Sequence, residues 1–465
     1  MKLLFVEFLL IACSMVLTEM YALKVRRLPI VPSKKDKAVL KEENDRGERM
    51  MKFIDSSPEP FHVVETCTSI LKAQGFMPLD ESKVWSDAQA IKAGGKYYYT
   101  RNRSSLVAFT VGQNYKSGNG FKIIGAHTDS PNLKVKPVSK RSSSGVTQVN
   151  IECYGGGLWH TWFDRDLSIA GRVIVKNGNM YEQRLVKINR SILRVPNLCI
   201  HLKTPEERDA FKVNKEDHLI PILCSELEKV INKDEEQKYG GGKEEEEEEE
   251  DQWLSVQEPK LMDIIADELD CDVSNIVDFE LSLFDTQNAA ISGATGEFLC
   301  GSRIDNLASC FVAMEALQTH AANGISTDED VSMIALFDHE EVGSGSSAGA
   351  GSPIMRDAVV RISEALSGNT EGSEVFKVAL SKSLIFSVDM AHAIHPNYAS
   401  KHESRLAPKM NCGVVIKSNA NQRYATNGKL TTGWCYLCFH FYPFIYIICL
   451  DTCVYVCMCV YMHLV

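Results

Sequence analysis

A stripe of apolar residues at helical spacing is the first clear pattern in the chain. In the stretch SSPEPFHVVETCTSILKAQGF, the residues Phe61, Val64, Cys67 (or Thr68) and Leu71 recur on one helical face. Prolines stand just before the stripe and a glycine follows it, which are start and stop signals for a helix. The pattern therefore predicts an amphipathic helix that packs its apolar face on a core.

Three later apolar runs share one design. FKIIGAHTD (residues 121–129), VSMIALFDHEE (331–341) and SLIFSVDMAHA (383–393) each carry four to seven apolar residues and then end abruptly in histidine or acid. Such short runs are typical of buried strands. In an open α/β sheet, catalytic groups gather at the carboxyl ends of strands. We therefore expect the ends of these three strands to lie together and to form one site.

A second helix is predicted between the first two of these runs. In RIDNLASCFVAMEAL the apolar positions fall at offsets 0, 3, 4, 7 and 10, which is a buried helical stripe. Asp305 lies just before that stripe. The positions are Leu307, Cys310, Phe311, Met314 and Leu317. Together the strands and helices predict an α/β fold with a mixed sheet flanked by helices.

The pattern changes between residues 132 and 281. The stretch TQVNIECYGGGLWHTWFDRDLSIAGRVIVK alternates short strands with glycine turns, which indicates an inserted β-rich domain. Within it, residues 234–252 contain a run of seven glutamates, and like charges in a block repel one another. We expect this acidic segment to be a disordered surface loop. The catalytic domain would then comprise residues 46–131 and 282–427.

Both ends of the chain are unusual. Residues 1–45 are predicted to be a leader and charged linker, because the first residues have the outline of a signal peptide, although Glu7 interrupts the apolar stretch. Residues 428–465 are rich in cysteine and aromatic residues and almost free of charge. Residues 434–450 approach the length of a membrane span, but Pro443 and His440 weaken that interpretation. We favour the interpretation that this tail is not a native protein segment.

Composition adds limits to this picture. The chain has 465 residues and a formal net charge of -11, of which the glutamate run supplies seven charges. The remaining mild acidity gives no electrostatic case for nucleic-acid binding. Of the fifteen cysteines, those before the tail are scattered singly and lack the paired spacing of a zinc site or a disulfide scaffold. A reducing, cytoplasmic compartment is expected, with a secretory or vacuolar route as the alternative that the N-terminus leaves open.

Taken singly, each acidic or histidine strand end has an ordinary structural explanation. His127 and Asp129 could form a turn with a hydrogen-bonded histidine. Asp305 could cap the helix that follows it, and the adjacent Glu340 and Glu341 could form an acidic first turn. Asp389, with His392 three residues on, could be another cap.

Taken together, the same residues favour a metal site. Several carboxylates in apolar surroundings carry a desolvation cost unless cations share the site. Imidazole and carboxylate ligands suit zinc, or manganese or cobalt, better than calcium or magnesium. In a site with two metals, one carboxylate bridges the ions and an attacking water loses its proton near neutral pH. A neighbouring carboxylate that is not a ligand can then act as general base.

Six motifs in one order carry a resemblance to a known family. They are GAHTDSP (125–131), YGGGLWHTWFDRDL (154–167), RIDN (303–306), DHEEVGS (338–344), SVDMAHAIHPNY (387–398) and QRYATN (422–427). In these motifs the chain resembles the aspartyl aminopeptidases of the M18 metallopeptidase family, over roughly residues 50 to 427. The resemblance implies removal of N-terminal Asp or Glu from peptides, with two Zn²⁺ per subunit.

The resemblance also implies a role for each motif residue. Asp305 would bridge the two metals, His127 and Asp389 would complete the first, and Glu341 would bind the second. Glu340 would be the general base that takes a proton from the attacking water and returns it to the leaving amine. Asp129 would lie behind the ligands and fix the tautomer of His127 through a hydrogen bond.

Substrate and partner contacts follow from the same resemblance. Lys417, Tyr424 and His392 stand where the family contacts substrate, and a lysine facing the substrate carboxylate is the physical expectation. A surface lysine is an equally ordinary interpretation of Lys417. The inserted domain would drive dimerisation within a dodecamer, and His201 would reach a partner's active site. No nucleic-acid or membrane partner is expected.

The chain departs from the family pattern after QRYATN. Family members continue to a Met-His motif whose histidine is the last ligand of the second metal. Neither His440 nor His463 stands in that context, so neither is assigned. Losing that ligand would weaken the second metal. Three hypotheses remain: an active aminopeptidase, an inactive family member that only oligomerises, and a membrane-anchored protein.

Overall fold

The structure is a computed structural model that describes residues 37–85, 91–226, 252–367, 372–405, 407–410, 415–417, 420–421 and 458–464. Contacts divide the chain into Met1–Asp45 and Arg46–Val465, and all the sheets belong to the second unit. The signal-like start, all but the last residue of the acidic segment 234–252 and the stretch 434–450 lie outside the described residues.

The first predicted helix is present, and another helix precedes it. Helix α2 (Lys37–Ser56) begins inside the segment expected to be a linker, and α3 (Pro60–Ala73) begins at the second proline as the pattern predicted. The Glu59 carboxylate caps α3 by accepting hydrogen bonds from the backbone N–H groups of Phe61 and His62, at 2.8 and 3.0 Å. Every position of the predicted stripe is buried, Thr68 as well as Cys67.

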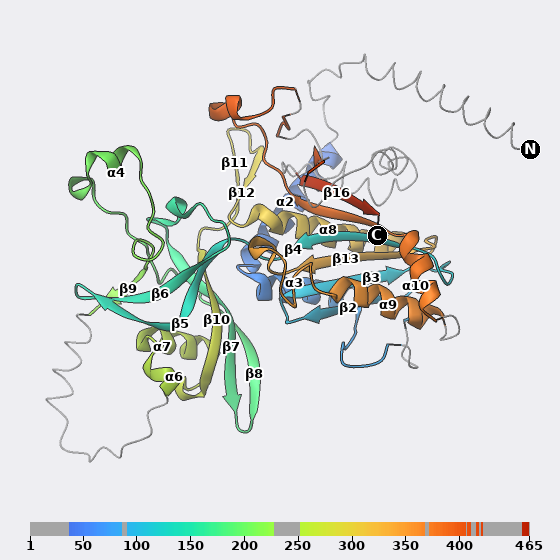
Figure 1. The fold of residues 1–465 in the computed structure, drawn as a ribbon, viewed down its shortest axis with the longest axis horizontal. Coiled ribbons are helices and arrows are strands. Elements are labelled where there is room, and N and C mark those ends of the chain that lie inside the picture. The colour runs from blue at the N-terminus through green and yellow to red at the C-terminus, as the bar shows by residue number, and fades with distance from the viewer. Residues whose placement is uncertain are drawn as a thin grey trace, which may run out of the picture. The chain divides into compact units, whose positions relative to one another are not determined.

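An eight-stranded sheet forms the centre of the region expected to be the catalytic domain (Figure 1). Strands β13 and β14 both run parallel to β4, which lies between them, whereas β3 pairs antiparallel with β13. The three predicted strands are therefore direct neighbours. In sheet order the strands are β1 (Met77–Pro78), β2 (Lys96–Arg101), β3 (Ser105–Val111), β13 (Val331–Phe337), β4 (Phe121–His127), β14 (Leu384–Met390), β16 (Met458–Leu464) and β15 (Val415–Ile416).

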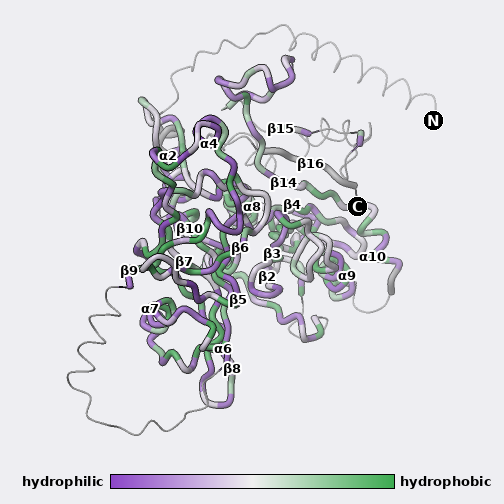
Figure 2. The backbone as a smooth tube through the Cα atoms, turned by 60° about the vertical axis from the view of Figure 1, so that its left-hand side comes forward, coloured by the Kyte–Doolittle hydropathy of each residue, from purple (hydrophilic) through white to green (hydrophobic). Residues whose placement is uncertain are grey.

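Hydrophobic cores cover both faces of this sheet. Ile124 and Ile334 pack with α2, α3 and α8 (Ile304–Asn323), while their neighbours Ile123 and Met333 pack with α9 (Ile354–Ser367) and α10 (Gly372–Ser381). Because alternate residues of a strand point to opposite faces, a strand covered on both sides reads as a continuous apolar run. Figure 2 shows this hydrophobic colouring along the central strands and α8. All five positions of the predicted α8 stripe are buried.

The β-rich region forms a separate six-stranded sheet, with α7 (Pro259–Leu269) packed into its core. Its last strand continues to Asp285, four residues past the boundary expected at 281. In sheet order the strands are β8 (Met180–Lys187), β7 (Leu167–Asn177), β10 (Ile276–Asp285), β5 (Asn132–Ser143), β6 (Val146–Tyr154) and β9 (Ile222–Ser225).

Short elements complete the described fold. A two-stranded sheet pairs β11 (Ala290–Ser292) with β12 (Phe298–Cys300). The remaining elements are the α-helices α4 (Pro205–Asp209) and α6 (Gln252–Ser255) and the 3-10 helices η1 (Trp159–Trp162), η2 (Ile200–Leu202), η3 (Val273–Asn275), η4 (Glu340–Val342) and η5 (Pro396–Lys401).

Part of the unusual C-terminal tail belongs to the main sheet. The backbone of β16 pairs antiparallel with β14 and parallel with β15. In this register His463 stands opposite Ile385, four residues before Asp389 on β14. His440 lies outside the described residues, and among those that are described no helix is long and apolar enough to cross a membrane.

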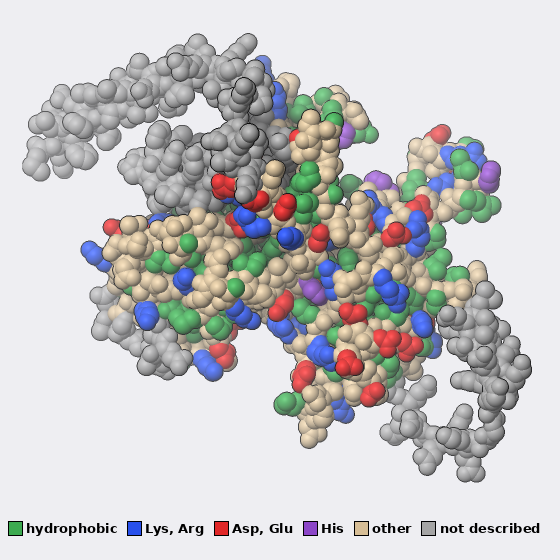
Figure 3. All heavy atoms as spheres, turned by 180° about the vertical axis from the view of Figure 1, so that it is seen from behind, with side chains coloured by type: hydrophobic (Ala, Val, Ile, Leu, Met, Phe, Trp, Pro, Cys, Tyr) green, Lys and Arg blue, Asp and Glu red, His purple; other side chains and the backbone are tan. Residues whose placement is uncertain are grey.

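Acidic and basic side chains intermingle over the face of the molecule shown in Figure 3.

Candidate metal centre and active site

Three parallel strands bring their carboxyl ends to one edge of the sheet. His127 is the last residue of β4 and pairs with Phe337, the last residue of β13. Asp389 lies near the end of β14, the strand on the other side of β4. The expectation that these strand ends meet is confirmed, because the parallel register places all three ends at the same edge.

Asp305 reaches this edge from the start of helix α8. Its backbone angles, φ -83° and ψ 104°, are not helical, and its carboxylate lies beside the His127 ring. The Ser130 hydroxyl donates a hydrogen bond to the Asp305 carbonyl oxygen at 2.6 Å, and the Asn306 amide donates to the Val388 carbonyl oxygen at 3.0 Å. These two bonds hold the backbone around Asp305 against the ends of the strands.

The His127 imidazole lies at the centre of the acidic cluster. Its Nε2 atom is 3.4 Å from Asp305 Oδ1, 3.5 Å from Asp389 Oδ1 and 3.8 Å from Glu340 Oε2. Two sets of ligand atoms close enough to hold an ion contain this histidine: His127 with Asp305 and Asp389, and His127 with Glu340 and Glu341. The first set has the membership that the resemblance implied for one metal.

The pKa shifts in this cluster show an excess of negative charge when no cation is bound. Burial opposes protonation of His127, but the carboxylates of Asp129, Asp305 and Asp389 outweigh burial and raise its pKa well above the usual range. Burial and the surrounding acids also raise the pKa of Glu340, and they raise that of Glu341 to about 7. Carboxylates this close do not all ionise unless positive charge is added. A divalent cation would provide that charge.

Asp129 organises the ligands from behind. Its side chain is fully buried, and its Oδ1 atom lies 3.3 Å from His127 Nδ1. The same carboxylate accepts the backbone N–H groups of Glu340 and Glu341, at 3.1 and 3.0 Å. The His127 ring nitrogen also lies 3.0 Å from the Asp129 carbonyl oxygen. With Nδ1 occupied, Nε2 is left for the acidic cluster, as the sequence hypothesis for Asp129 requires.

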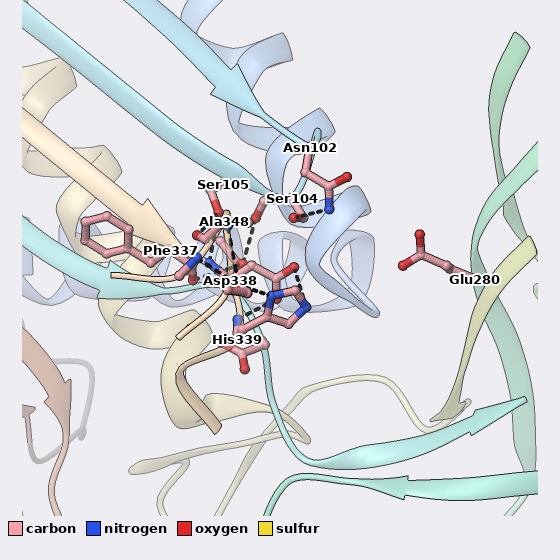
Figure 4. A network of polar contacts seen from close by, with 12 residues as sticks. Asn102, Ser104, Ser105, Glu280, Phe337, Asp338, His339 and Ala348 are labelled. Atoms are coloured by element: carbon pink, nitrogen blue, oxygen red, sulfur yellow. Dashed lines mark hydrogen bonds and ion pairs between the residues drawn. The ribbon is translucent and has the colours of Figure 1, made fainter. Parts of the chain in front are cut away.

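The turn that carries the glutamates is built on Asp338, to which the sequence assigned no role. Burial raises the pKa of the Asp338 carboxyl, which contacts Ser104 and accepts the His339 backbone N–H at 2.8 Å. The Asp338 backbone N–H donates to the Ser105 hydroxyl at 2.9 Å, and that hydroxyl donates to the Ala348 carbonyl oxygen. Figure 4 shows this network between the end of β13 and the loop before β3.

His339 and the two glutamates continue this turn. His339 adopts a left-handed conformation, with φ 62°, and its Nδ1 atom lies 2.6 Å from the Ser346 hydroxyl. Glu340 and Glu341 then begin the 3-10 helix η4. Successive residues of a 3-10 helix are rotated by about 120°. The side chains of Glu340 and Glu341 therefore point in different directions.

Among the described residues, no contact joins His201 or His392 to the cluster. His201 lies exposed in η2, in the β-rich region. His392 is exposed, and its ring lies tilted against that of His402, with centroids 5.4 Å apart. Lys417 is partly buried just after β15, and Tyr424 lies outside the described residues.

Tyr154 is a site residue that sequence reasoning missed. Its hydroxyl donates a hydrogen bond to Asp129 Oδ2 at 2.7 Å, from the last position of β6. Next to it, a Cβ atom added at Gly155 would lie 3.1 Å from the Glu341 Cβ atom. The signal was present in the YGGG motif, but nothing in the local pattern connects that motif to an acid 25 residues earlier.

The residues at this edge fit a metal such as zinc. One imidazole and several carboxylates converge within ligand distance, and imidazole with carboxylate is a common donor set for zinc. Asp129 contacts His127 in the way that carboxylates behind metal-bound histidines do in other proteins, where they orient the ring. An α/β sheet with such a cluster at its carboxyl edge defines a metal-dependent hydrolase.

Comparison with known proteins identifies the family. A family model described as "Aminopeptidase I zinc metalloprotease (M18)" matches residues 53–440. The chain belongs to this M18 family.

Similar proteins are named accordingly. A probable aspartyl aminopeptidase of Ricinus communis is 44% identical over 394 residues, covering 81% of this chain and 78% of that protein. An aspartyl aminopeptidase of Dictyostelium discoideum is 45% identical over 391 residues, covering 82% and 80%. A solved mApe1 dodecamer of S. cerevisiae superposes with a TM-score of 0.71 at 26% identity, covering 85% and 84%.

Proposed function

We propose that this M18 metalloaminopeptidase removes N-terminal aspartate or glutamate from peptides with two zinc ions per subunit. The convergence of His127, Asp305 and Asp389 with the glutamate pair at one sheet edge carries the proposal. Asp305 would bridge the ions, His127 and Asp389 would complete one of them, and Glu341 would bind the other. Manganese or cobalt would satisfy the same donors. The acidic substrate is proposed because the similar proteins are named aspartyl aminopeptidases.

The side chains divide the chemistry among them. Bound zinc would act as a Lewis acid on the scissile carbonyl and would lower the pKa of the attacking water. The Glu340 carboxylate accepts the proton of that water and returns it to the amine nitrogen as the peptide bond breaks. Since Glu340 lies as near to His127 as a ligand would, distance alone does not separate base from ligand.

Recognition of the acidic residue is assigned to groups that follow β14 and β15. Lys417 would pair with the side-chain carboxylate of the substrate, and Tyr424 and His392 would line the same subsite. A lysine attracts a carboxylate as a point charge, so this pairing would favour Asp and Glu over neutral residues.

We propose that the subunits assemble as in the solved mApe1 dodecamer of S. cerevisiae. The β-rich region, residues 132–281, would form the dimer contact, and His201 would enter a neighbour's active site. His201 and the residues Ile200 and Leu202 beside it are exposed in a single subunit, which supports a contact there. The seven cysteines from Cys67 to Cys310 are free thiols, which supports a reducing cytoplasmic location.

A direct assay tests the function. Purified full-length protein is loaded with zinc and given peptides that begin with Asp, Glu, Ala or Lys. We expect release of Asp and Glu with two zinc ions bound per chain. If the chain hydrolyses none of these peptides and binds fewer than two ions, the proposed activity is wrong for this chain, and the alternative of an inactive family member stands.

The role of Glu340 has its own test. Glu340→Gln keeps the size of the side chain but removes the base, so turnover should fall by about 10²- to 10⁴-fold. Zinc content, measured by atomic emission, should stay at the wild-type value. Retained turnover would refute the assignment as base, and lost zinc would make Glu340 a ligand.

A further inference from the structure

The β-rich region contributes a side chain to the support of the metal site. The chain leaves the site after Asp129 and enters β5 at Asn132. It returns along β6, and the antiparallel register pairs Asn132 with Tyr154. This hairpin therefore brings Tyr154 back to the point where the chain left the site.

The contact that results is specific and sheltered. The Tyr154 hydroxyl donates to Asp129 Oδ2 at 2.7 Å, and Asp129 is fully buried. The Lys134 ammonium lies 4.6 Å from the centre of the Tyr154 ring, a cation–π distance. The ring also lies beside His339, with centroids 6.2 Å apart. Tyr154 is therefore restrained through its hydroxyl and through contacts to its ring.

We propose that Tyr154 is a positioning residue, which acts through Asp129 to hold the metal ligands in place. Asp129 Oδ2 is shared between the Tyr154 hydroxyl and the Glu341 backbone N–H, and Oδ1 is shared between His127 and the Glu340 backbone N–H. Fixing one carboxylate oxygen fixes the other, because the group is planar.

This inference rests on the proposed metal function, and it gives the β-rich region a role within each subunit. A contact that only joined subunits would not need to reach the ligands. Partners behind metal ligands change metal affinity or activity by about 10- to 100-fold when they are removed. The loss of the Tyr154 hydroxyl should fall in that range if the inference is correct.

The test compares two tyrosines that lose the same group. Tyr154→Phe removes the hydroxyl at the site. Tyr99→Phe removes a buried hydroxyl that donates to the Ile354 carbonyl oxygen, also at 2.7 Å, on the face of the main sheet covered by α9. Zinc affinity is measured by calorimetry on the metal-free full-length protein. We expect Tyr154→Phe to weaken zinc binding about 10- to 100-fold, and Tyr99→Phe to leave it unchanged.

A second measurement needs no metal. Hydrogen exchange of a peptide that covers residues 338–343 reports on the Glu340 and Glu341 amides, which Asp129 accepts. In the metal-free protein, Tyr154→Phe should speed this exchange by about tenfold, the equivalent of one hydrogen bond. Tyr99→Phe should not change it.

The outcomes separate this inference from the proposed function. If Tyr154→Phe matches Tyr99→Phe in zinc affinity and in exchange, the positioning role is wrong. It is also wrong if Tyr154→Phe has its full effect in an Asp129→Ala background, because the hydroxyl would then act by another route. If the wild-type protein binds no zinc, the proposed function fails, and the exchange comparison still decides the role of Tyr154.

Discussion

Replacing Asp129 by asparagine should destabilise the protein and its metal site together. The substitution keeps the shape of the side chain but turns one acceptor oxygen into an NH₂ group. If that group replaces Oδ2, the Tyr154 hydroxyl can rotate to accept from it, but the Glu341 N–H loses its acceptor. If it replaces Oδ1, the Glu340 N–H loses its acceptor instead. Either orientation leaves one donor unpaired.

The magnitude follows from these contacts. An unpaired buried donor costs about 1–3 kcal/mol, and each remaining bond to the lost charge weakens by about 0.5–1 kcal/mol. The His127 ring keeps its contact with the Asp129 backbone carbonyl, so its tautomer is preserved. The free energy of unfolding should therefore fall by about 3 kcal/mol. Zinc affinity should fall about 10- to 100-fold.

Urea unfolding of the metal-free protein and zinc calorimetry measure the two effects. Asp328→Asn is the matched control, because Asp328 is also a buried acid in an ion pair, 2.7 Å from Lys122, but it lies beyond the opposite edge of the sheet. The control should lose stability and keep its zinc affinity. The reasoning is refuted if Asp129→Asn unfolds within about 0.5 kcal/mol of the wild type and binds zinc equally well.

Three further changes test the fold and its electrostatics. Gly155→Ala should cost more stability than Gly178→Ala and should also lower activity. Both glycines have a positive φ, of 75° and 60°, but only at Gly155 would an added Cβ press against Glu341. Equal losses of stability would refute this contact. Phe311→Ala, in the core under α8, should lower the free energy of unfolding by about 3–5 kcal/mol in urea titrations, and a loss below about 1 kcal/mol would contradict that packing. For Asp328, burial opposes ionisation, but its cationic partners outweigh burial and hold the pKa well below the usual range. A lowered pKa stabilises the fold above about pH 4 and ceases to do so as pH falls, so the cost of Asp328→Asn should be largest near neutral pH and shrink in acid; a constant difference would exclude the linkage.

Much of the catalytic fold could be predicted from local spacing. The helical stripe around Phe311 and the apolar run that ends at His127 each record burial that a single element needs, so each is visible within a few residues. Helix α2 was not predicted, because its mean character is polar and its charged residues mask the stripe.

The residue types of the candidate site could be predicted from the sequence. The residues that hold those side chains in place could not. His127 and Asp389 are predictable because acids and histidines at the ends of apolar strands are costly unless they bind something, and Asp305 because it stands just before a buried helical stripe. The supports of the site come from distant segments. The Asp338 turn rests on Ser104 and Ser105, more than 230 residues earlier in the chain. Local patterns contain no record of such contacts.

By itself, the sequence determined which segments are buried strands and helices, and which side chains can bind a metal. Those properties depend on side-chain chemistry and on periods of two or 3.6 residues, which are local. The tertiary structure alone decided that β4 lies between β13 and β14, and that Tyr154 returns to Asp129. Strand order and hairpin register depend on how distant segments pair, and a one-residue shift in register would point Tyr154 to the other face.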